Sequence, residues 1–265
     1  MIDALLTWDE QLRRDLPWRG VRDPYAVLVS EVMLQQTQAA RVAPRWRAWI
    51  TRWPTAASLA SASPAEVLGE WVGLGYNRRA LRLHEACAIV ARDGWPEDLT
   101  ALPGVGPYTA AAVASFAFGK DVAAVDTHVR RVCSRLRRGS PEELLPPGRA
   151  AAFNQAMMDL GATVCRARNP RCGDCPVAGW CASRGRVEAP LLRRAAGRSG
   201  RARFRDTSRW ARGRVVASLA AGEGLPGDVP AARLRDALAG LERDGIVVLG
   251  GDGAPRFPDF RDTVL

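Results

Sequence analysis

Apolar residues recur every three to four positions along most of the first 183 residues, and Pro or Gly interrupts the pattern between the runs. This periodicity predicts amphipathic helices. Several runs open on a proline, which is typical of the first turn of a helix. The clearest predicted helices are Tyr25–Gln38, Ala39–Arg52, Pro64–Val72, Arg78–Asp93, Pro107–Phe118, Thr127–Leu136 and Gly148–Leu160. Strand-like alternation is nearly absent, so we expect this part of the chain to be all-α.

The composition changes after residue 183. Residues 184–214 are rich in arginine and poor in large apolar side chains, which is typical of an exposed linker, and we place that linker at 184–207. Beyond it the pattern predicts two further helices, followed by a short hairpin around the apolar run 246–249. Two helices and a hairpin are a winged-helix-like pattern. We therefore expect a small winged-helix-like α+β domain over 208–265.

The chain is strongly basic, with a formal charge of +10 at pH 7 and a pI of about 10.3. A protein this basic often binds nucleic acid. Lys120 is the only lysine among the 38 basic residues, which equally fits a genome that uses arginine as its general surface cation. No apolar run reaches the length of a membrane span, and the N-terminus lacks a signal-peptide pattern. We expect a cytoplasmic protein without a membrane partner, in which structural disulfides are rare.

Four of the six cysteines lie close together in the spacing C-x6-C-x2-C-x5-C. They are Cys165, Cys172, Cys175 and Cys181. Four thiolates so close favour a metal or iron–sulfur site over four buried thiols. Zinc often uses two C-x2-C pairs, and this spacing contains one, so it favours a [4Fe–4S] cluster over zinc. Arginines flank the cysteines and would present positive charge to phosphate. Cys87 and Cys133 lie on apolar helix faces and are expected in the core.

The segment LPGVGPYT, residues 102–109, combines two glycines with a proline. Gly104 and Gly106 permit positive φ and close backbone approach, and Pro107 suits the first turn of a helix. Backbone N–H groups of such a turn form an anion site suited to a DNA phosphate. Together with the helix that ends near Asp93, the segment predicts a helix–hairpin–helix motif.

The hairpin, the aspartate Asp126 that follows Tyr108, and the cysteine spacing resemble the helix–hairpin–helix DNA glycosylase superfamily that includes endonuclease III. Finer matches resemble its A/G-specific adenine glycosylase branch, the MutY type. They are LPWR (16–19), DPY (23–25), SEVMLQQT (30–37), GLGY (73–76) and FNQAMMDLGATVC (153–165). The resemblance runs through the first 181 residues. It implies a glycosylase domain over 1–183, with a six-helix barrel at about 20–130 and an iron–sulfur cluster subdomain made of an N-terminal helix and 131–183.

The resemblance assigns the chemistry to Glu31, Asp126 and Tyr108. Adenine leaves poorly as an anion, so the reaction needs a proton donor, and a carboxylate near the sugar stabilises the positive charge that develops there. Glu31 lies on an apolar helix, where burial should raise its pKa and favour the protonated acid, although a Glu on a helix is more commonly solvated. Asp126 matches the carboxylate that faces C1′, while its place before a helix equally fits an N-cap.

Tyr108 decides between two reaction types. It matches the tyrosine that hydrogen-bonds within the MutY-type site, whereas bifunctional relatives carry a lysine at this position, form a Schiff base and nick the strand. Tyrosine cannot form a Schiff base. We therefore expect a monofunctional glycosylase that leaves an abasic site.

The resemblance also implies contacts with DNA. Gln35, Gln36 and Tyr76 match the wedge that fills the stack after base extrusion and probes the opposite base. The alternatives are polar helix surface for the two glutamines and core packing for the tyrosine. Positions lining the adenine pocket are matched by Arg19 and Leu16. The remaining candidates for DNA binding are Thr37, Gly104, Gly106 and His128.

The sequence departs from the MutY branch at two places. His128 stands where that branch usually has Asn, and it either donates a hydrogen bond toward the DNA or is a satisfied structural histidine. The usual C-terminal Nudix-like domain, which reads 8-oxoguanine, does not fit in Ser208–Leu265. We expect either that the tail and the wedge suffice to read the opposite base, or that the preference for that base is looser or different.

These observations predict a monofunctional DNA glycosylase of base excision repair that acts as a monomer on double-stranded DNA with a mispaired or damaged base. Its substrate would be adenine opposite 8-oxoguanine or guanine. A mismatch-specific thymine or uracil glycosylase is the alternative, since such relatives also carry tyrosine at position 108; Glu31 disfavours it. A third hypothesis, a non-catalytic DNA-binding iron–sulfur regulator, is disfavoured because Glu31, Asp126 and Tyr108 occur together.

Overall fold

The computed structural model describes residues 1–186, 204–251 and 253–258. Residues 187–203, which include most of the predicted arginine-rich linker, lie outside the described residues, as do 252 and 259–265. Among the described residues, no helix is both long enough and apolar enough to span a membrane. The predicted domain boundaries at 183 and 208 stay predictions.

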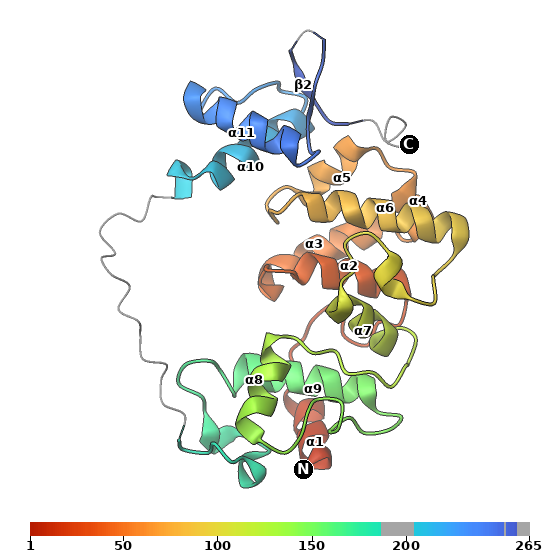
Figure 1. Cartoon of the computed structure of the whole chain (residues 1–265), viewed down its shortest axis with the longest axis vertical. Coiled ribbons are helices and arrows are strands. Elements are labelled where there is room, and N and C mark those ends of the chain that lie inside the picture. The colour runs from red at the N-terminus through yellow and green to blue at the C-terminus, as the bar shows by residue number, and fades with distance from the viewer. Residues whose placement is uncertain (187–203, 252, 259–265) are drawn as a thin grey trace. The chain divides into compact units, whose positions relative to one another are not determined.

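Helices dominate the described part of the chain (Figure 1). They are α1 (Ile2–Leu12), α2 (Pro24–Leu34), α3 (Ala39–Arg52), α4 (Ala56–Ala60), α5 (Pro64–Trp71), α6 (Arg78–Asp93), α7 (Pro107–Phe116), α8 (Thr127–Leu136), α9 (Ala150–Thr163), α10 (Ser208–Ala220) and α11 (Ala231–Arg243). Four 3-10 turns accompany them, η1 (Leu99–Ala101), η2 (Cys172–Asp174), η3 (Ala178–Trp180) and η4 (Phe204–Asp206). The all-α expectation is confirmed, and α2 to α7 are six helices within the range expected of the barrel.

The predicted helix bounds are met at some helices and missed at others. The prediction matches α3, α6 and α8 from end to end. α2 ends at Leu34 rather than Gln38, because Gln36 adopts a left-handed backbone conformation, φ 55°, which does not continue a helix. α7 ends at Phe116 rather than Phe118, and α9 spans Ala150–Thr163 rather than Gly148–Leu160. α4 was not predicted, since five residues are too few to show a helical period.

The chain forms two compact units, and the first contains α1, the part of α2 up to Glu31, and everything described from Val105 to residue 186. Within this unit α9 packs against α1, α7 and α8. Its core includes Leu5 from α1, Val129 from α8, and Phe153 and Leu160 from α9, each at most 2% exposed. The core therefore fixes α8, which follows Asp126, upon α9.

The second unit contains the end of α2, the helices α3 to α6, and the C-terminal segment from residue 204. α6 packs on α4 and α5. Trp49 lies edge-on to Trp53 and to Trp71, with ring centroids 4.7 and 5.5 Å apart. These three rings form an aromatic core between α3 and α5.

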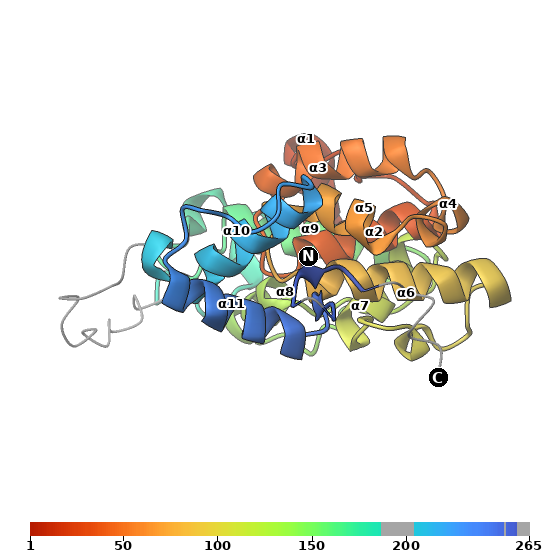
Figure 2. The ribbon, with the colours of Figure 1, turned by 90° about the horizontal axis from the view of Figure 1, so that it is seen from above.

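The C-terminal segment has the predicted order of helix, helix and hairpin. α10 packs against α11 and also against α5, and α10 and α11 lie side by side in both views (Figures 1 and 2). The strands β1 (Val248–Leu249) and β2 (Pro255–Arg256) pair antiparallel. The predicted order of elements is thus observed, and this segment belongs to the same compact unit as α3 to α6, while a winged-helix-like domain at 208–265 stays a prediction.

Candidate functional site

Glu31 lies in the last part of α2 and is buried, with 6% of its surface exposed. Burial raises the pKa of its carboxyl group to about 7; a hydrogen bond from Tyr108 opposes the rise, and the charge of Asp126 adds to it. The expectation of a buried Glu31 is confirmed, and the solvated-surface alternative is excluded. A carboxyl group with this pKa is substantially protonated near neutral pH, as a proton donor must be.

Tyr108 is the second residue of α7, directly after Pro107, and is half-buried. Burial and the neighbouring charges of Glu31 and Asp126 raise its pKa above the usual range, so its hydroxyl group stays neutral. The Tyr108 hydroxyl also lies 3.9 Å from the Met158 sulfur. Glu31, Tyr108 and Asp126, which are widely separated in sequence, are therefore close enough in the first unit to interact.

Asp126 is the N-cap of α8, and its Oδ1 accepts a hydrogen bond from the Val129 amide at 2.7 Å. The capping alternative is thus confirmed. The charge of Asp126 also raises the pKa of Glu31. The carboxylate that caps α8 therefore lies close enough to Glu31 to interact with it. The cap fixes its position at the helix terminus, which is what a preorganised electrostatic group requires.

Asn154, on α9, holds the segment that leads to Asp126. It is fully buried; its Oδ1 accepts from the Ala124 amide at 3.0 Å, and its Nδ2 donates to the carbonyl of Val122 and to the hydroxyl of Ser115, both at 2.9 Å. The sequence reasoning missed this role. The signal in the sequence was a polar residue on the apolar face of a predicted helix. A side-chain amide that is buried at such a position must find hydrogen-bond partners.

Arg19 is engaged by the protein itself. Its guanidinium pairs with Asp159 on α9 and donates to Gln155 at 2.9 Å, and only 11% of its side chain is exposed. Arg14 pairs with the same carboxylate, its Nε lying 2.7 Å from Oδ1 of Asp159. Leu16 lies half-buried in the same segment. These contacts tie the segment after α1 to α9, and a role of Arg19 and Leu16 in a base pocket stays a prediction.

The wedge candidates lie on two loops of the second unit. Gln36 and Tyr76 both adopt left-handed backbone conformations, with φ of 55° and 51°. Gln36 is exposed, Gln35 and Thr37 are half-buried, and Tyr76 is 47% exposed, which excludes core packing for the tyrosine. Left-handed conformations are uncommon for residues other than glycine and cluster at functional sites.

Arg79, the second residue of α6, joins these two loops and was not recognised from the sequence. Its guanidinium lies 5.2 Å from the Trp71 ring centroid and 5.6 Å from that of Tyr76. It donates to the carbonyl groups of Val32 (2.8 Å), Met33 (3.1 Å), Gln35 (2.6 Å), Leu74 (3.3 Å) and Gly75 (2.9 Å), and to the hydroxyl of Thr37 (3.3 Å). Burial lowers the pKa of Arg79 to about 10, so it stays charged at neutral pH. One cation therefore caps the end of α2 and holds the turn that carries Tyr76.

The two glycines of the turn before α7 differ in backbone conformation. Gly104 has a φ of +77°, and a Cβ there would lie 3.0 Å from Cβ of Arg82. Gly106 has a φ of −88° and does not use the positive φ that glycine permits; it serves as the N-cap of α7 without a side-chain cap. A phosphate contact at this turn stays a prediction.

His128 packs between α8 and α9. A Cβ added to Gly161 would lie 2.6 Å from Cβ of His128, and Nη2 of Arg131 lies 3.3 Å from Nδ1 of the imidazole. Arg131 also donates to the Gly161 carbonyl at 2.7 Å. These contacts favour the structural alternative for His128, and a contact with DNA stays a prediction.

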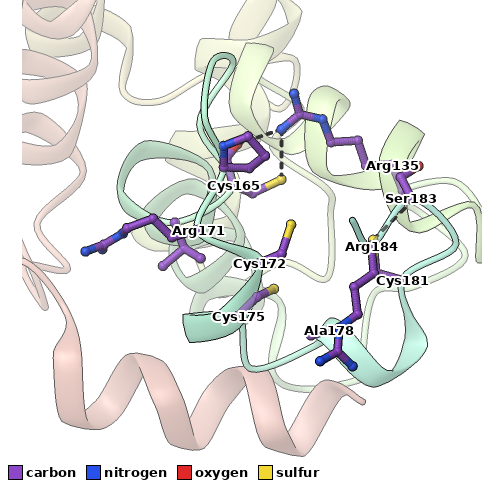
Figure 3. Close-up of a pocket in the computed structure, with 11 residues that line it drawn as sticks. Arg135, Cys165, Arg171, Cys172, Cys175, Ala178, Cys181, Ser183 and Arg184 are labelled. Atoms are coloured by element: carbon purple, nitrogen blue, oxygen red, sulfur yellow. Dashed lines mark hydrogen bonds between the residues drawn. The ribbon is translucent and has the colours of Figure 1, made fainter. Parts of the chain in front are cut away.

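The four clustered cysteines line one pocket (Figure 3). Arg135, Arg171 and Arg184 also line it, and no acidic residue or histidine does so among the described residues. Arg135 was not predicted; its Nη1 donates to the Cys165 sulfur at 3.3 Å. Four thiols beside cationic groups fit an anionic [4Fe–4S] cluster, for which Cys165, Cys172, Cys175 and Cys181 would be the ligands. The other two cysteines, Cys87 and Cys133, are buried in the core as expected.

Two family models match the chain. Residues 29–145 match the HhH-GPD superfamily of base excision DNA repair proteins. Residues 165–181, which contain all four clustered cysteines, match the iron–sulfur binding domain of endonuclease III. The second match and the thiol-lined cavity agree on a [4Fe–4S] cluster.

The chain is also similar to individual proteins. It is 52% identical over 194 residues to an adenine DNA glycosylase of Mycolicibacterium smegmatis, covering 65% of this chain and 66% of that protein. It is 47% identical over 242 residues to an adenine DNA glycosylase of Mycobacterium tuberculosis, covering 83% of this chain and 78% of that protein. Among solved structures, a thermostable thymine-DNA glycosylase superposes with a TM-score of 0.63 at 31% identity, covering 70% of this chain and 95% of that chain.

Proposed function

The chain belongs to the HhH-GPD superfamily of base excision DNA repair proteins, and we propose that within it the chain is a monofunctional adenine DNA glycosylase. The observation that carries the proposal is the buried Glu31, whose pKa is raised to about 7 beside Tyr108 and Asp126. Two carboxyl groups in different environments can divide acid catalysis and charge stabilisation between them.

In the proposed reaction Glu31 gives its proton to the adenine of an extruded nucleotide. The bond between C1′ and the base breaks, and its electron pair leaves with the protonated base. Asp126 stabilises the positive charge that develops on the sugar. Water then adds to C1′ and gives up a proton, which the Glu31 carboxylate takes up, so that the acid is restored. Tyr108 stays neutral and keeps Glu31 in place through their hydrogen bond. The products are free adenine and an abasic site.

Strand cleavage by a Schiff base is not part of this reaction. Tyr108 offers no amine, and Lys120 is exposed and follows the end of α7. From Tyr108 to the last residue of that helix is about 12 Å, at 1.5 Å per residue. The DNA strand therefore stays intact after the base has left.

The partner is double-stranded DNA with adenine opposite 8-oxoguanine or guanine. Gln35, Gln36 and Tyr76 serve as the wedge, and the turn at Gly104 and Gly106 contacts a phosphate. The proposed DNA-binding set further includes Arg19, Leu16, Thr37 and His128. The cluster, held by the four cysteines, supplies iron–thiolate bonds that cross-link the loop after α9. The protein acts as a cytoplasmic monomer, with the glycosylase domain at 1–183.

Removal of thymine or uracil is the second candidate, favoured by the likeness to the thymine-DNA glycosylase structure. The buried acid Glu31 separates the two candidates, since a pyrimidine has less need of a protonated leaving group. The test is a single-turnover panel on duplexes that carry A:8-oxoguanine, A:G, T:G or U:G. We expect adenine release from the first two, with strand breaks only after hot alkali. Release of thymine or uracil instead, or strand breaks without alkali, would contradict the proposal.

A further inference from the structure

Tyr76 lies between two arginines that come from distant parts of the chain. The guanidinium of Arg79 lies 5.6 Å from the centroid of the Tyr76 ring, and that of Arg209 lies 5.2 Å from it. Nη2 of Arg209 also donates to the Tyr76 hydroxyl at 3.0 Å, across 133 residues of sequence. The tip and the ring of an exposed tyrosine are therefore held by the C-terminal segment.

The position of Arg209 is fixed by the packing of α10. Arg209 is the second residue of this helix, whose N-cap Thr207 accepts from the Trp210 amide at 3.3 Å. α10 packs on α5, where Cβ of Ala220 lies 3.6 Å from the place that a Cβ of Gly69 would occupy. Arg209 thus approaches Tyr76 from a helix that is anchored on α5, which belongs to the same unit.

The turn that carries Tyr76 is attached to the same helix. Trp71, the last residue of α5, is buried, and its Nε1 donates to the Gly75 carbonyl at 3.0 Å. Arg79 fixes the other side of this turn through the carbonyl groups of Leu74 and Gly75. Both partners of the contact between Arg209 and Tyr76 are therefore held relative to α5.

Arg209 differs from the other arginines of α10 in its contact. Arg212 pairs with Asp244, and Arg214 pairs with Asp228 at 3.0 Å. Within the described ranges no carboxylate pairs with Arg209, whose contact is the tyrosine. The guanidinium of Arg209 thus contacts a tyrosine rather than a carboxylate. An arginine in this position can stack on the ring and donate a hydrogen bond to the hydroxyl at the same time.

We propose that Arg209 is a positioning residue for Tyr76, through which the C-terminal helices take part in reading the base opposite the extruded adenine. This inference rests on the proposed function, in which Tyr76 is the wedge. A ring whose hydroxyl is held before DNA arrives loses less rotational freedom when it enters the base stack. The contact therefore favours binding to the mispair, where the wedge is inserted, over binding to matched duplex.

The experiment compares Arg209→Ala with Arg214→Ala in the full, cluster-containing chain. Both variants remove one positive charge from α10, and only the first removes the contact with Tyr76. Binding is measured to a duplex with a non-cleavable 2′-fluoro adenosine opposite 8-oxoguanine and to a matched duplex of the same length. We expect Arg209→Ala to weaken binding to the mispair about fivefold more than Arg214→Ala does, with equal effects of the two variants on matched duplex.

A double-mutant cycle shows whether Arg209 acts through Tyr76. Tyr76→Phe keeps the ring and removes the hydroxyl, so adding it to Arg209→Ala should weaken binding less than the sum of the single effects. Arg209→Lys, which keeps the charge and a donor, should recover part of the loss. Equal behaviour of Arg209→Ala and Arg214→Ala on both duplexes, or fully additive effects in the cycle, would overturn the inference.

Failure of this inference is distinguishable from failure of the proposed function. If the wild-type chain releases no adenine from the A:8-oxoguanine duplex, the proposed function fails and the wedge role with it. If the wild type releases adenine and the two arginine variants match, only the role of Arg209 is wrong. Should Arg209→Ala unfold, Arg209→Gln keeps a long polar side chain without the charge and is compared with Arg214→Gln in the same way.

Discussion

Raising the pH should slow adenine release, because Glu31 must carry a proton to act as the acid. Burial raises the pKa of Glu31 from its ordinary value of 4.5 to about 7, against the hydrogen bond from Tyr108 and together with the charge of Asp126. This rise corresponds to about 3 kcal/mol in favour of the protonated carboxyl group. A group with a raised pKa keeps its proton below that value and loses it as the pH rises through it. The rate is therefore full in acid and declines above about pH 7.

The decline can be measured by single-turnover release of adenine from an A:8-oxoguanine duplex, with enzyme in excess. Each pH unit above the pKa lowers the protonated fraction about tenfold, so the rate constant at about pH 9 should be about 100-fold below the acid plateau. Quenched samples are treated with hot alkali, which converts every abasic site to a strand break whatever the reaction pH. Binding to a non-cleavable duplex at each pH separates loss of chemistry from loss of affinity.

The variant Tyr108→Phe gives a second, directional test of the same reasoning. The hydroxyl of Tyr108 lowers the pKa of Glu31, so its removal should move the alkaline decline to higher pH while the ring still packs. A rate constant that does not change between about pH 6 and pH 9, or a decline that moves to lower pH in this variant, would refute Glu31 as the buried acid.

Three further predictions concern the parts that support the site. Gly161→Ala places a methyl group against His128 and should lower the stability of the first unit by about 1–3 kcal/mol, measured as a lower thermal midpoint; an unchanged midpoint would show that α8 and α9 can separate freely. Asn154→Ala removes three hydrogen bonds from the approach to Asp126 and should slow base release about tenfold or more, while DNA affinity is kept; an equal loss of both would point to general unfolding. Cys172→Ser should abolish the iron–sulfur absorbance near about 400 nm, whereas a colourless wild type that holds zinc would contradict the [4Fe–4S] assignment.

The local sequence pattern was sufficient to predict several elements of this fold. α3, α6 and α8 were predicted end to end, because each has a clear apolar face. α6 and α8 also have a turn-forming residue or a capping residue at a boundary. The burial of Glu31 followed from its apolar neighbours on α2. The cysteine spacing indicated that the four thiols lie close together, and they line one pocket.

Contacts between distant segments were not accessible from the sequence. Arg79 reaches carbonyl groups up to 47 residues away, and Arg19 pairs with a carboxylate 140 residues away. The contact of Arg209 with Tyr76 depends on the packing of α10 against α5, which no local pattern specifies. The sequence shows that these side chains are charged, and only the fold determines which partner each one meets.

The most direct test of the account is base release and binding by Glu31→Gln on the A:8-oxoguanine duplex. Glutamine keeps the size of the side chain and cannot donate the proton. The wild type should release adenine, and the variant should bind the duplex with similar affinity and release none. A variant that still releases adenine at the wild-type rate would show that the proton comes from elsewhere and that the buried carboxyl group is not the acid.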